Sequence, residues 1–389
     1  MTTVPPDAAH GDTLQFDFQP TIRLRFGPGS LAELGKAAKE LGGSRVLLVT
    51  DPGLRAAGHE DNAINRLEEA GLAVFTFDKV EENPDTHVVE ACVTFAKEAG
   101  GIDLIVGLGG GSSMDCAKGT NFLLSNGGQM KDYWGKGLAK KPMIASIGIP
   151  TTAGTGSEAQ CFALISDAAT HRKMACGDMK ARFRTVILDP ELLRSVPREV
   201  AATTGMDAVT HALESFVTSS RNPVSQMFGR EAWRLLNTNF ETVFAGNVDD
   251  DVWGNMMLAA HYSGCAIENS MLGAAHACAN PLTARFNVTH GVAVGLMLPH
   301  VIRFNNHTVS HLYDDLAGVK DPGTGAEILA RRVAAMQAAA GMPTHLTGFG
   351  IQATDLEQLA QDAKTQWTGN FNPRPVAVEQ FHALYETAL

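Results

Sequence analysis

The feature that most limits the fold is an alternation of short apolar runs with helical patterns between residues 44 and 188. Alternation of this kind predicts βαβ units, and therefore a mostly parallel sheet with helices packed on its faces. The expected strands are Arg45–Thr50, Leu72–Phe77, Asp103–Gly107 and Met143–Ile149, followed by a hairpin of Phe162–Ser166 and Lys173–Cys176.

After Leu188 the strand signal nearly vanishes. Val224–Phe244 and Gly325–Ala340 place Ala, Leu and Met at helical spacing, which predicts an all-helical second half. We therefore predict an α/β domain over residues 1–190 and a helical domain over residues 191–389, packed tightly around a cleft because no low-complexity linker separates them. Leu14–Phe26 is a further strand candidate, able to pair with a sheet edge in the same subunit or in another.

Charge and composition exclude several classes of partner. The chain has 31 basic and 42 acidic residues, a net charge of −11 that repels phosphate backbones and anionic membrane surfaces. We therefore expect no nucleic-acid partner, and no apolar run reaches the roughly 20 residues of a membrane span. The start lacks the regions of a secretion signal, and six scattered cysteines without a C-x-x-C pair are typical of a reduced, cytoplasmic protein.

A glycine-rich turn follows a buried-looking strand. Leu104–Asp115 leads into three consecutive glycines and then a helix that we place at Ser113–Ser125. Backbone N–H groups at such a helix start can hold a pyrophosphate, because glycine permits close approach and the helix dipole favours negative charge. The segment matches neither the G-x-G-x-x-G fingerprint nor a Walker loop, so a turn without a ligand remains the alternative.

Two further features lie where strands end. Pro150–Glu158 offers hydroxyl and amide groups together, and open α/β sheets bind ligands at the carboxyl ends of their strands. Asp51 ends the second strand, where a carboxylate can accept hydrogen bonds from a ribose diol and repel a 2′-phosphate. A ribose contact here would favour NAD over NADP, although an Asp at a strand end is more often a helix cap or turn residue.

Histidines gather in the helical half, where nine of the 13 lie from His211 onward. Asp207 and His211 are four residues apart and therefore share one helical face. His276 and His290 would lie about 21 Å apart along one straight helix. They can share an ion only if the helix ends between them, and Pro281, Arg285–Asn287 and the His290–Gly291 step allow such a break.

Three imidazoles and one carboxylate would suit Fe²⁺ or Zn²⁺ and leave room for a substrate oxygen. Solvated or structurally paired histidines are the alternative interpretation. His261 and His300 are rival ligands, and His307 and His311 repeat the i, i+4 spacing in a polar stretch.

Taken together, these segments resemble the iron-containing alcohol dehydrogenase family, also called group III, over nearly the whole chain. The matching segments, in order, are Phe26–Gly29, Gly109–Asp115, Pro150–Glu158, Gly205–His211, His276 through Gly291, Leu298–His300 and Asn372–Arg374. The resemblance implies a Rossmann-like dinucleotide-binding domain and a helical metal domain, in a dehydroquinate synthase-like architecture that forms homodimers or larger homo-oligomers.

The resemblance also implies a set of site residues. The implied metal ligands are Asp207, His211, His276 and His290. The implied cofactor contacts are Gly110, Gly111 and Ser112 in the pyrophosphate cradle, Thr151 and Thr152 in the second loop, Asp51 at the ribose, and Asn83 and Lys173.

One position departs from the family pattern. Many members carry another His four residues after the third ligand, facing the nicotinamide and assigned to proton transfer, and here that residue is Asn280. An amide does not titrate near neutral pH, and a positioned base is typically worth about 10²–10⁴ in rate. The catalytic base is therefore left unassigned.

The expected activity is reversible hydride transfer between NAD(H) and a small aliphatic alcohol or diol, with Fe²⁺ or Zn²⁺ as a Lewis acid. Three alternatives stay open: a hydroxyacid–oxoacid transhydrogenase, a metal- and nucleotide-binding protein without catalysis, and a lyase related to dehydroquinate synthase.

Overall fold

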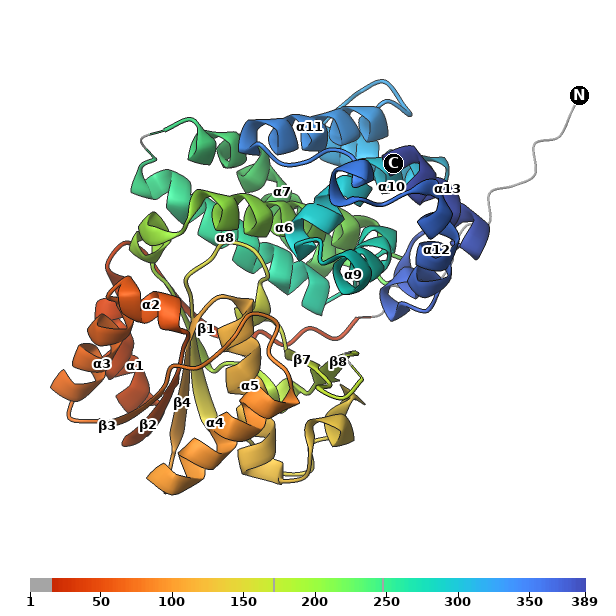
Figure 1. Cartoon of the computed structure of the whole chain (residues 1–389). Helices are drawn as coiled ribbons and strands as arrows, with labels where there is room; N and C mark the ends of the chain where they lie inside the picture. Colours follow the sequence, from red (N-terminus) through yellow and green to blue (C-terminus); the bar gives the residue numbers. More distant parts are fainter. Residues whose placement is uncertain (1–15, 171, 247) are drawn as a thin grey trace, which may run out of the picture.

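The computed structural model describes residues 16–170, 172–246 and 248–389. In Figure 1 the α/β part lies below and the helical part above, with the carboxyl ends of the central strands directed toward the helices. Within the described residues, none of the helices is long and apolar enough to cross a bilayer.

A six-stranded parallel sheet forms the centre of the lower part, in the order β1-β9-β6-β4-β2-β3. The predicted parallel sheet is confirmed. The strands are β1 (Arg23–Phe26), β2 (Arg45–Val49), β3 (Ala73–Phe77), β4 (Leu104–Gly109), β6 (Ala145–Pro150) and β9 (Thr185–Leu188).

The first strand candidate is shorter than expected. Only Arg23–Phe26 is a strand, and it pairs in parallel with β9 of the same chain. Residues 16–22 form no further strand, and residues 14 and 15 lie outside the described part.

The predicted hairpin is confirmed as β7 (Phe162–Ser166) paired antiparallel with β8 (Lys173–Gly177). A two-residue strand, β5 (Gly135–Lys136), adds to the other edge of β8 and completes a second, three-stranded sheet.

Helices cover both faces of the main sheet because alternate residues of its strands point to opposite sides. Val46 and Leu48 of β2 pack in one apolar cluster, whereas Leu47 and Val49 pack in the other, and all four are fully buried. The helices of this part are α1 (Leu34–Glu40), α2 (Pro52–Ala56), α3 (His59–Glu69), α4 (Thr86–Ala99) and α5 (Gly111–Asn126).

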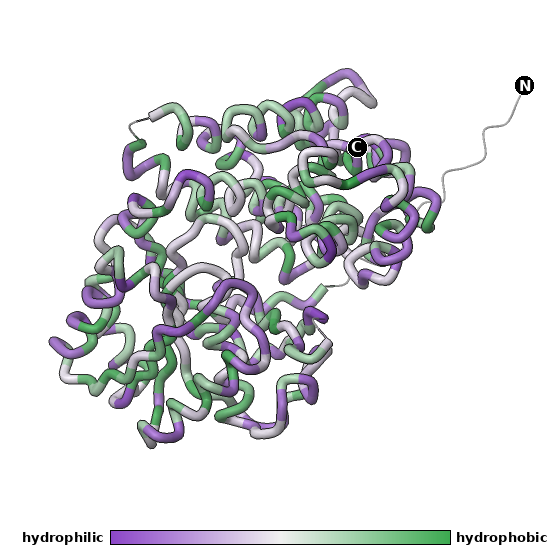
Figure 2. Tube along the Cα trace, viewed as in Figure 1, coloured by the Kyte–Doolittle hydropathy of each residue, from purple (hydrophilic) through white to green (hydrophobic). Residues whose placement is uncertain are grey.

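No strand follows Leu188 in the described part of the chain, so the prediction of a helical C-terminal region is confirmed. Hydrophobic and hydrophilic segments alternate along these helices in Figure 2, as packing of one face against a core requires. The helices are α6 (Arg198–Val217), α7 (Pro223–Phe244), α8 (Asp250–Glu268), α9 (Ala274–Phe286), α10 (His290–Ala317), α11 (Gly325–Ala340), α12 (Leu356–Lys364) and α13 (Val378–Ala388).

Candidate metal and cofactor site

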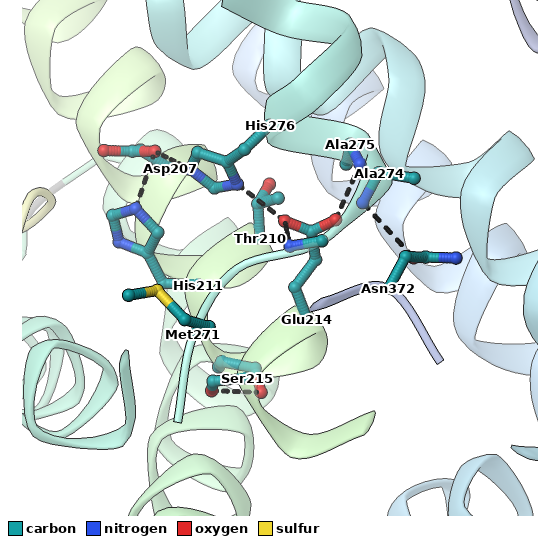
Figure 3. Close-up of polar contacts among 12 residues, drawn as sticks. Asp207, Thr210, His211, Glu214, Ser215, Met271, Ala274, Ala275, His276 and Asn372 are labelled. Carbon is teal, nitrogen blue, oxygen red and sulfur yellow. Dashed lines mark hydrogen bonds and ion pairs between the residues drawn. The ribbon is translucent and has the colours of Figure 1, made fainter. Parts of the chain in front are cut away.

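Helix α6 supplies the first two candidate ligands. Asp207 and His211 lie one turn apart and are both 5% exposed, with His211 Nε2 3.2 Å from Asp207 Oδ1. Figure 3 shows the two side chains directed toward each other and His276 approaching the same carboxylate.

The break between α9 and α10 brings the other two candidate ligands, His276 and His290, to the cluster. Pro281 lies inside α9 and does not end it; the helix ends at Asn287, whose positive φ of 53° reverses the chain. Helix α10 then begins at His290. A Cβ on Gly291 would overlap the backbone of Thr203, one turn before Asp207, so the start of α10 packs directly on α6.

Three candidate ligand atoms, from Asp207, His276 and His290, lie within 4.8 Å of one another. His276 Nε2 is 3.5 Å and His290 Nε2 3.7 Å from Asp207 Oδ1. His211 stands slightly outside this set and stacks on His276, with ring centroids 4.9 Å apart. Three of the four side chains predicted from the resemblance, the histidines, therefore surround a carboxylate oxygen of the fourth, Asp207.

The chemistry of this cluster fits a cation. Asp207 Oδ1 and His276 Nε2 are buried and find no hydrogen-bond partner among the described residues, which is costly unless another partner satisfies them. No other group of three or more potential metal-binding side chains is found among the residues described.

Glu214 was not predicted from the sequence. It contacts the ring nitrogen of His276 that points away from Asp207. Its Oε2 lies 2.6 Å from His276 Nδ1, and its Oε1 accepts a hydrogen bond of 2.6 Å from the amide of Ala275 (Figure 3). The carboxylate keeps the proton on Nδ1 and turns Nε2 toward Asp207. The available signal was position, because Glu214 lies two turns after Asp207 on the same helix face.

Burial and neighbouring charge set the protonation of the cluster. Burial opposes ionisation of Asp207, but His211 and its neighbours outweigh it and hold the pKa of that carboxyl well below its ordinary value. Burial lowers the pKa of His211 to about 4 and that of His290 to about 3. At His276, Asp207 and Glu214 overcome burial and raise the pKa to about 9. An ionised carboxylate and neutral imidazoles are the forms that bind metals, and His276 carries the proton that a cation would replace.

The two loops predicted for the nucleotide lie side by side. Thr151 N donates to Gly109 O at 3.0 Å, joining the ends of β4 and β6. A Cβ on Gly111 would lie 2.7 Å from Thr155 Cγ2, so a side chain there would force the loops apart. Gly110 caps α5 and lies close to Thr152, leaving the first N–H groups of a 16-residue helix at this edge.

Three more predicted contacts come together at the same edge. Asn83 N donates to Ser112 Oγ at 3.1 Å, and Lys173 Nζ donates to Asn83 Oδ1 at 3.2 Å. Burial is the main cause of the lowered pKa of His290, and the positive charge of Lys173 contributes to it.

The position of Asp51 is compatible with both predicted roles, a helix cap and a ribose contact. One oxygen caps α2 by accepting a hydrogen bond of 3.0 Å from Gly53 N, and the other accepts one of 3.3 Å from Ser113 Oγ. The carboxylate therefore stands at the end of β2 next to the glycine loop.

The rival histidines lie elsewhere. His261 Nδ1 is 3.1 Å from Glu158 Oε1, and His300 lies in α10 away from the cluster. Asn280, one turn after His276 on α9, donates to Gln366 Oε1 at 3.0 Å.

Comparisons with known proteins identify the family of the chain. Residues 20–190 match the profile of the family "Iron-containing alcohol dehydrogenase", and residues 201–389 match "Fe-containing alcohol dehydrogenase family, C-terminal". The chain is 34% identical over 359 residues to a 1,3-propanediol dehydrogenase of Citrobacter freundii, covering 90% of this chain and 92% of the relative. It is 32% identical over 372 residues to an NAD-dependent methanol dehydrogenase of Bacillus methanolicus, covering 93% and 97%.

Solved structures show the same likeness. The crystal structure of a 1,3-propanediol oxidoreductase matches with a TM-score of 0.93 and 31% identity, over 96% of this chain and 100% of the other. An alcohol dehydrogenase from Oenococcus oeni matches with a TM-score of 0.93 and 27% identity, with the same coverage. The chain belongs to the iron-containing alcohol dehydrogenase family and is an oxidoreductase that acts on CH–OH groups.

Proposed function

We propose that the protein transfers hydride reversibly between NAD(H) and a small aliphatic alcohol or diol, with Fe²⁺ as its metal and Zn²⁺ as the alternative. The observation that carries this proposal is the convergence of three histidines on Asp207. The family's iron-containing description favours iron, whereas the mixed N/O donor set admits either ion.

In the proposed site Asp207, His211, His276 and His290 hold the metal, and Glu214 fixes the orientation of His276. When bound, the metal supplies Lewis-acid stabilisation to the substrate oxygen. Asp207, His211 and His276 are buried, which strengthens their electrostatic effect, whereas His290 is 34% exposed.

On the nucleotide side, the amides at Gly110, Gly111 and Ser112 would hold the pyrophosphate at the start of α5, where the helix dipole favours an anion. Thr151 and Thr152 would line the same cradle. The other proposed cofactor contacts are Asn83 and Lys173, which are hydrogen-bonded to each other, and Asp51 at the ribose. Asp51 favours NAD, because its charge would repel the 2′-phosphate of NADP.

Position 280 contributes no titratable group. Asn280 is held by Gln366, so it can position a polar group but cannot exchange a proton near neutral pH. We assign no side-chain base; a bound nucleotide would supply ribose hydroxyl groups that, with water, could accept the alcohol proton.

The names of the relatives support a substrate class. Their names include 1,3-propanediol dehydrogenase, methanol dehydrogenase and lactaldehyde reductase, which supports a short alcohol, diol or hydroxyaldehyde as the substrate. We further propose a division into domains at residues 190 and 191, and a homodimer or larger homo-oligomer in the cytoplasm.

The test is NADH formation or consumption by the Fe²⁺-loaded protein over a panel of short alcohols, diols and aldehydes. We expect turnover that depends on metal and nucleotide. Exchange between paired hydroxy and oxo acids without free NADH would instead show a transhydrogenase. Protein that binds both metal and nucleotide but turns over none of these compounds would contradict the proposal.

A further inference from the structure

A thiol, an imidazole and a carboxylate form a cluster that the proposed reaction does not use. Cys265 and His261 lie one turn apart on α8, with His261 Nε2 3.7 Å from Cys265 Sγ. On its other side His261 Nδ1 is 3.1 Å from Glu158 Oε1. The histidine and the glutamate are 4% and 3% exposed, whereas Cys265 is only half-buried.

This arrangement places a thiol, an imidazole and a carboxylate in sequence, as in sites with a cysteine nucleophile. An imidazole in contact with sulfur, oriented by a carboxylate, favours the thiolate form that acts as a nucleophile. Burial alone would lower the pKa of His261, but Cys265 and Glu158 outweigh it and raise the pKa to about 10. A protonated imidazole next to Cys265 would stabilise a negative charge on sulfur.

The other five cysteines have the opposite environment. All are buried, and burial raises the pKa of Cys161 and that of Cys176 to about 12. These five buried thiols should react slowly, so their alkylation rates serve as internal controls for that of Cys265.

The cluster joins helix α8 to the loop Pro150–Glu158. Gly264, next to Cys265, packs against Gly156 so closely that a Cβ on Gly264 would lie 2.5 Å from Gly156 O. Glu158, the acid of the cluster, is part of the same loop. A group added to Cys265 would therefore disturb the Glu158–His261 contact and, with it, the loop that carries Thr151 and Thr152.

We propose that Cys265 is a peroxide-reactive modification site whose oxidation shifts this loop and weakens nucleotide binding. The sulfur of Cys265 attacks one peroxide oxygen, so that an S–O bond forms as the O–O bond breaks. The hydroxide that leaves takes a proton from the imidazolium of His261 and departs as water. Sulfur loses two electrons to the peroxide and becomes a sulfenic acid. The effect on nucleotide binding rests on the proposed function, whereas the reactivity of the thiol does not.

The first experiment measures iodoacetamide alkylation of the full-length protein, cysteine by cysteine, by peptide mass spectrometry. His261→Asn keeps an amide donor toward Glu158 but has no counterpart of Nε2. We expect alkylation of Cys265 to be about tenfold slower in this variant than in the protein without the substitution. His311→Asn, an exposed change on α10, is the matched control and should leave the rate unchanged.

Glu158→Gln is the second variant, because it keeps a hydrogen-bond acceptor for His261 and removes only the charge. It should slow alkylation by a few-fold. Equal rates at Cys265 in the unmodified protein and in both folded variants would overturn the assignment of an activated thiol.

The second experiment treats metal-free protein with hydrogen peroxide, traps sulfenic acid with dimedone and titrates NADH by fluorescence. We expect an adduct at Cys265 and NADH binding weakened about tenfold, with neither effect in Cys265→Ser. An adduct with unchanged NADH affinity would overturn the link to the loop. Absence of NADH binding before treatment would count against the proposed function instead, because the alkylation rates do not depend on it.

Discussion

At the scale of single residues, two carboxylates on one face of α6 have different tasks. Asp207 presents an oxygen that three imidazoles approach, whereas Glu214 is satisfied by Ala275 and the far nitrogen of His276. The first is a ligand in the proposed site, and the second positions a ligand.

Glu214→Gln should separate these tasks. An amide cannot accept hydrogen bonds through its nitrogen, so either His276 Nδ1 or the amide of Ala275 loses its acceptor. We expect Zn²⁺ affinity, measured by competition with a fluorescent chelator, to fall about 10–100-fold. Glu60→Gln, which changes a buried carboxylate in α3, is the control. Unchanged Zn²⁺ affinity in Glu214→Gln would mean that this carboxylate only stabilises the fold.

Asp51→Ser tests the choice of nucleotide. Serine can still cap α2, so the helix keeps most of its stability while the negative charge is removed. We expect the ratio of kcat/KM for NAD to that for NADP to fall about tenfold or more. A ratio that stays constant would place the ribose away from Asp51.

At the scale of elements, the site depends on where α9 ends and how α10 starts. Sequence spacing showed that one straight helix could not bring His276 and His290 together, and it located the break only within a segment. Proline was part of that argument, yet Pro281 continues the helix and Asn287 ends it. Local propensity could not decide between them, because tertiary packing of α10 on α6 favours the later break.

Gly291→Ala tests this packing directly. By helix propensity alone the change would stabilise α10 by up to about 1 kcal/mol. Because a Cβ would overlap the backbone of Thr203, we expect a lower melting temperature and weaker Zn²⁺ binding instead. Gly348→Ala, where a Cβ meets nothing within 4 Å, controls for the added methyl group. A more stable Gly291→Ala protein would refute the close contact.

A surface ion pair between α10 and α11 gives a pH-dependent prediction. Glu327 binds Arg303 across the two helices and Arg331 on its own helix, and these hydrogen bonds lower its pKa to about 2. Since the folded-state pKa lies below the ordinary value of 4.5, the stabilisation is present above that pH and is lost as pH falls toward 2.

Glu327→Gln should therefore lower stability slightly near neutral pH and have no effect near pH 2. The carboxylate is 44% exposed, so we expect less than about 1 kcal/mol from urea unfolding. A difference that grew on acidification would contradict the sign of this linkage.

At the scale of the whole molecule, hydrophobic periodicity was enough for the parallel sheet, the hairpin and the helical region. The four candidate metal ligands came from a resemblance and from spacing, and the structure gathers them around Asp207. Glu214 and the Cys265–His261–Glu158 cluster were not predicted, because their partners lie about 60 to 100 residues away in the sequence. Such contacts depend on how α6, α8 and α9 pack, which periodicity does not encode.

The central claim is that one metal ion joins side chains from three helices. Anomalous diffraction at the iron absorption edge, from crystals of the Fe²⁺-loaded protein, tests it most directly. We predict one strong peak about 2.0–2.3 Å from Asp207 Oδ1 and from the Nε2 atoms of His211, His276 and His290. A peak bound by other side chains, or no peak in protein that retains iron in solution, would contradict the account.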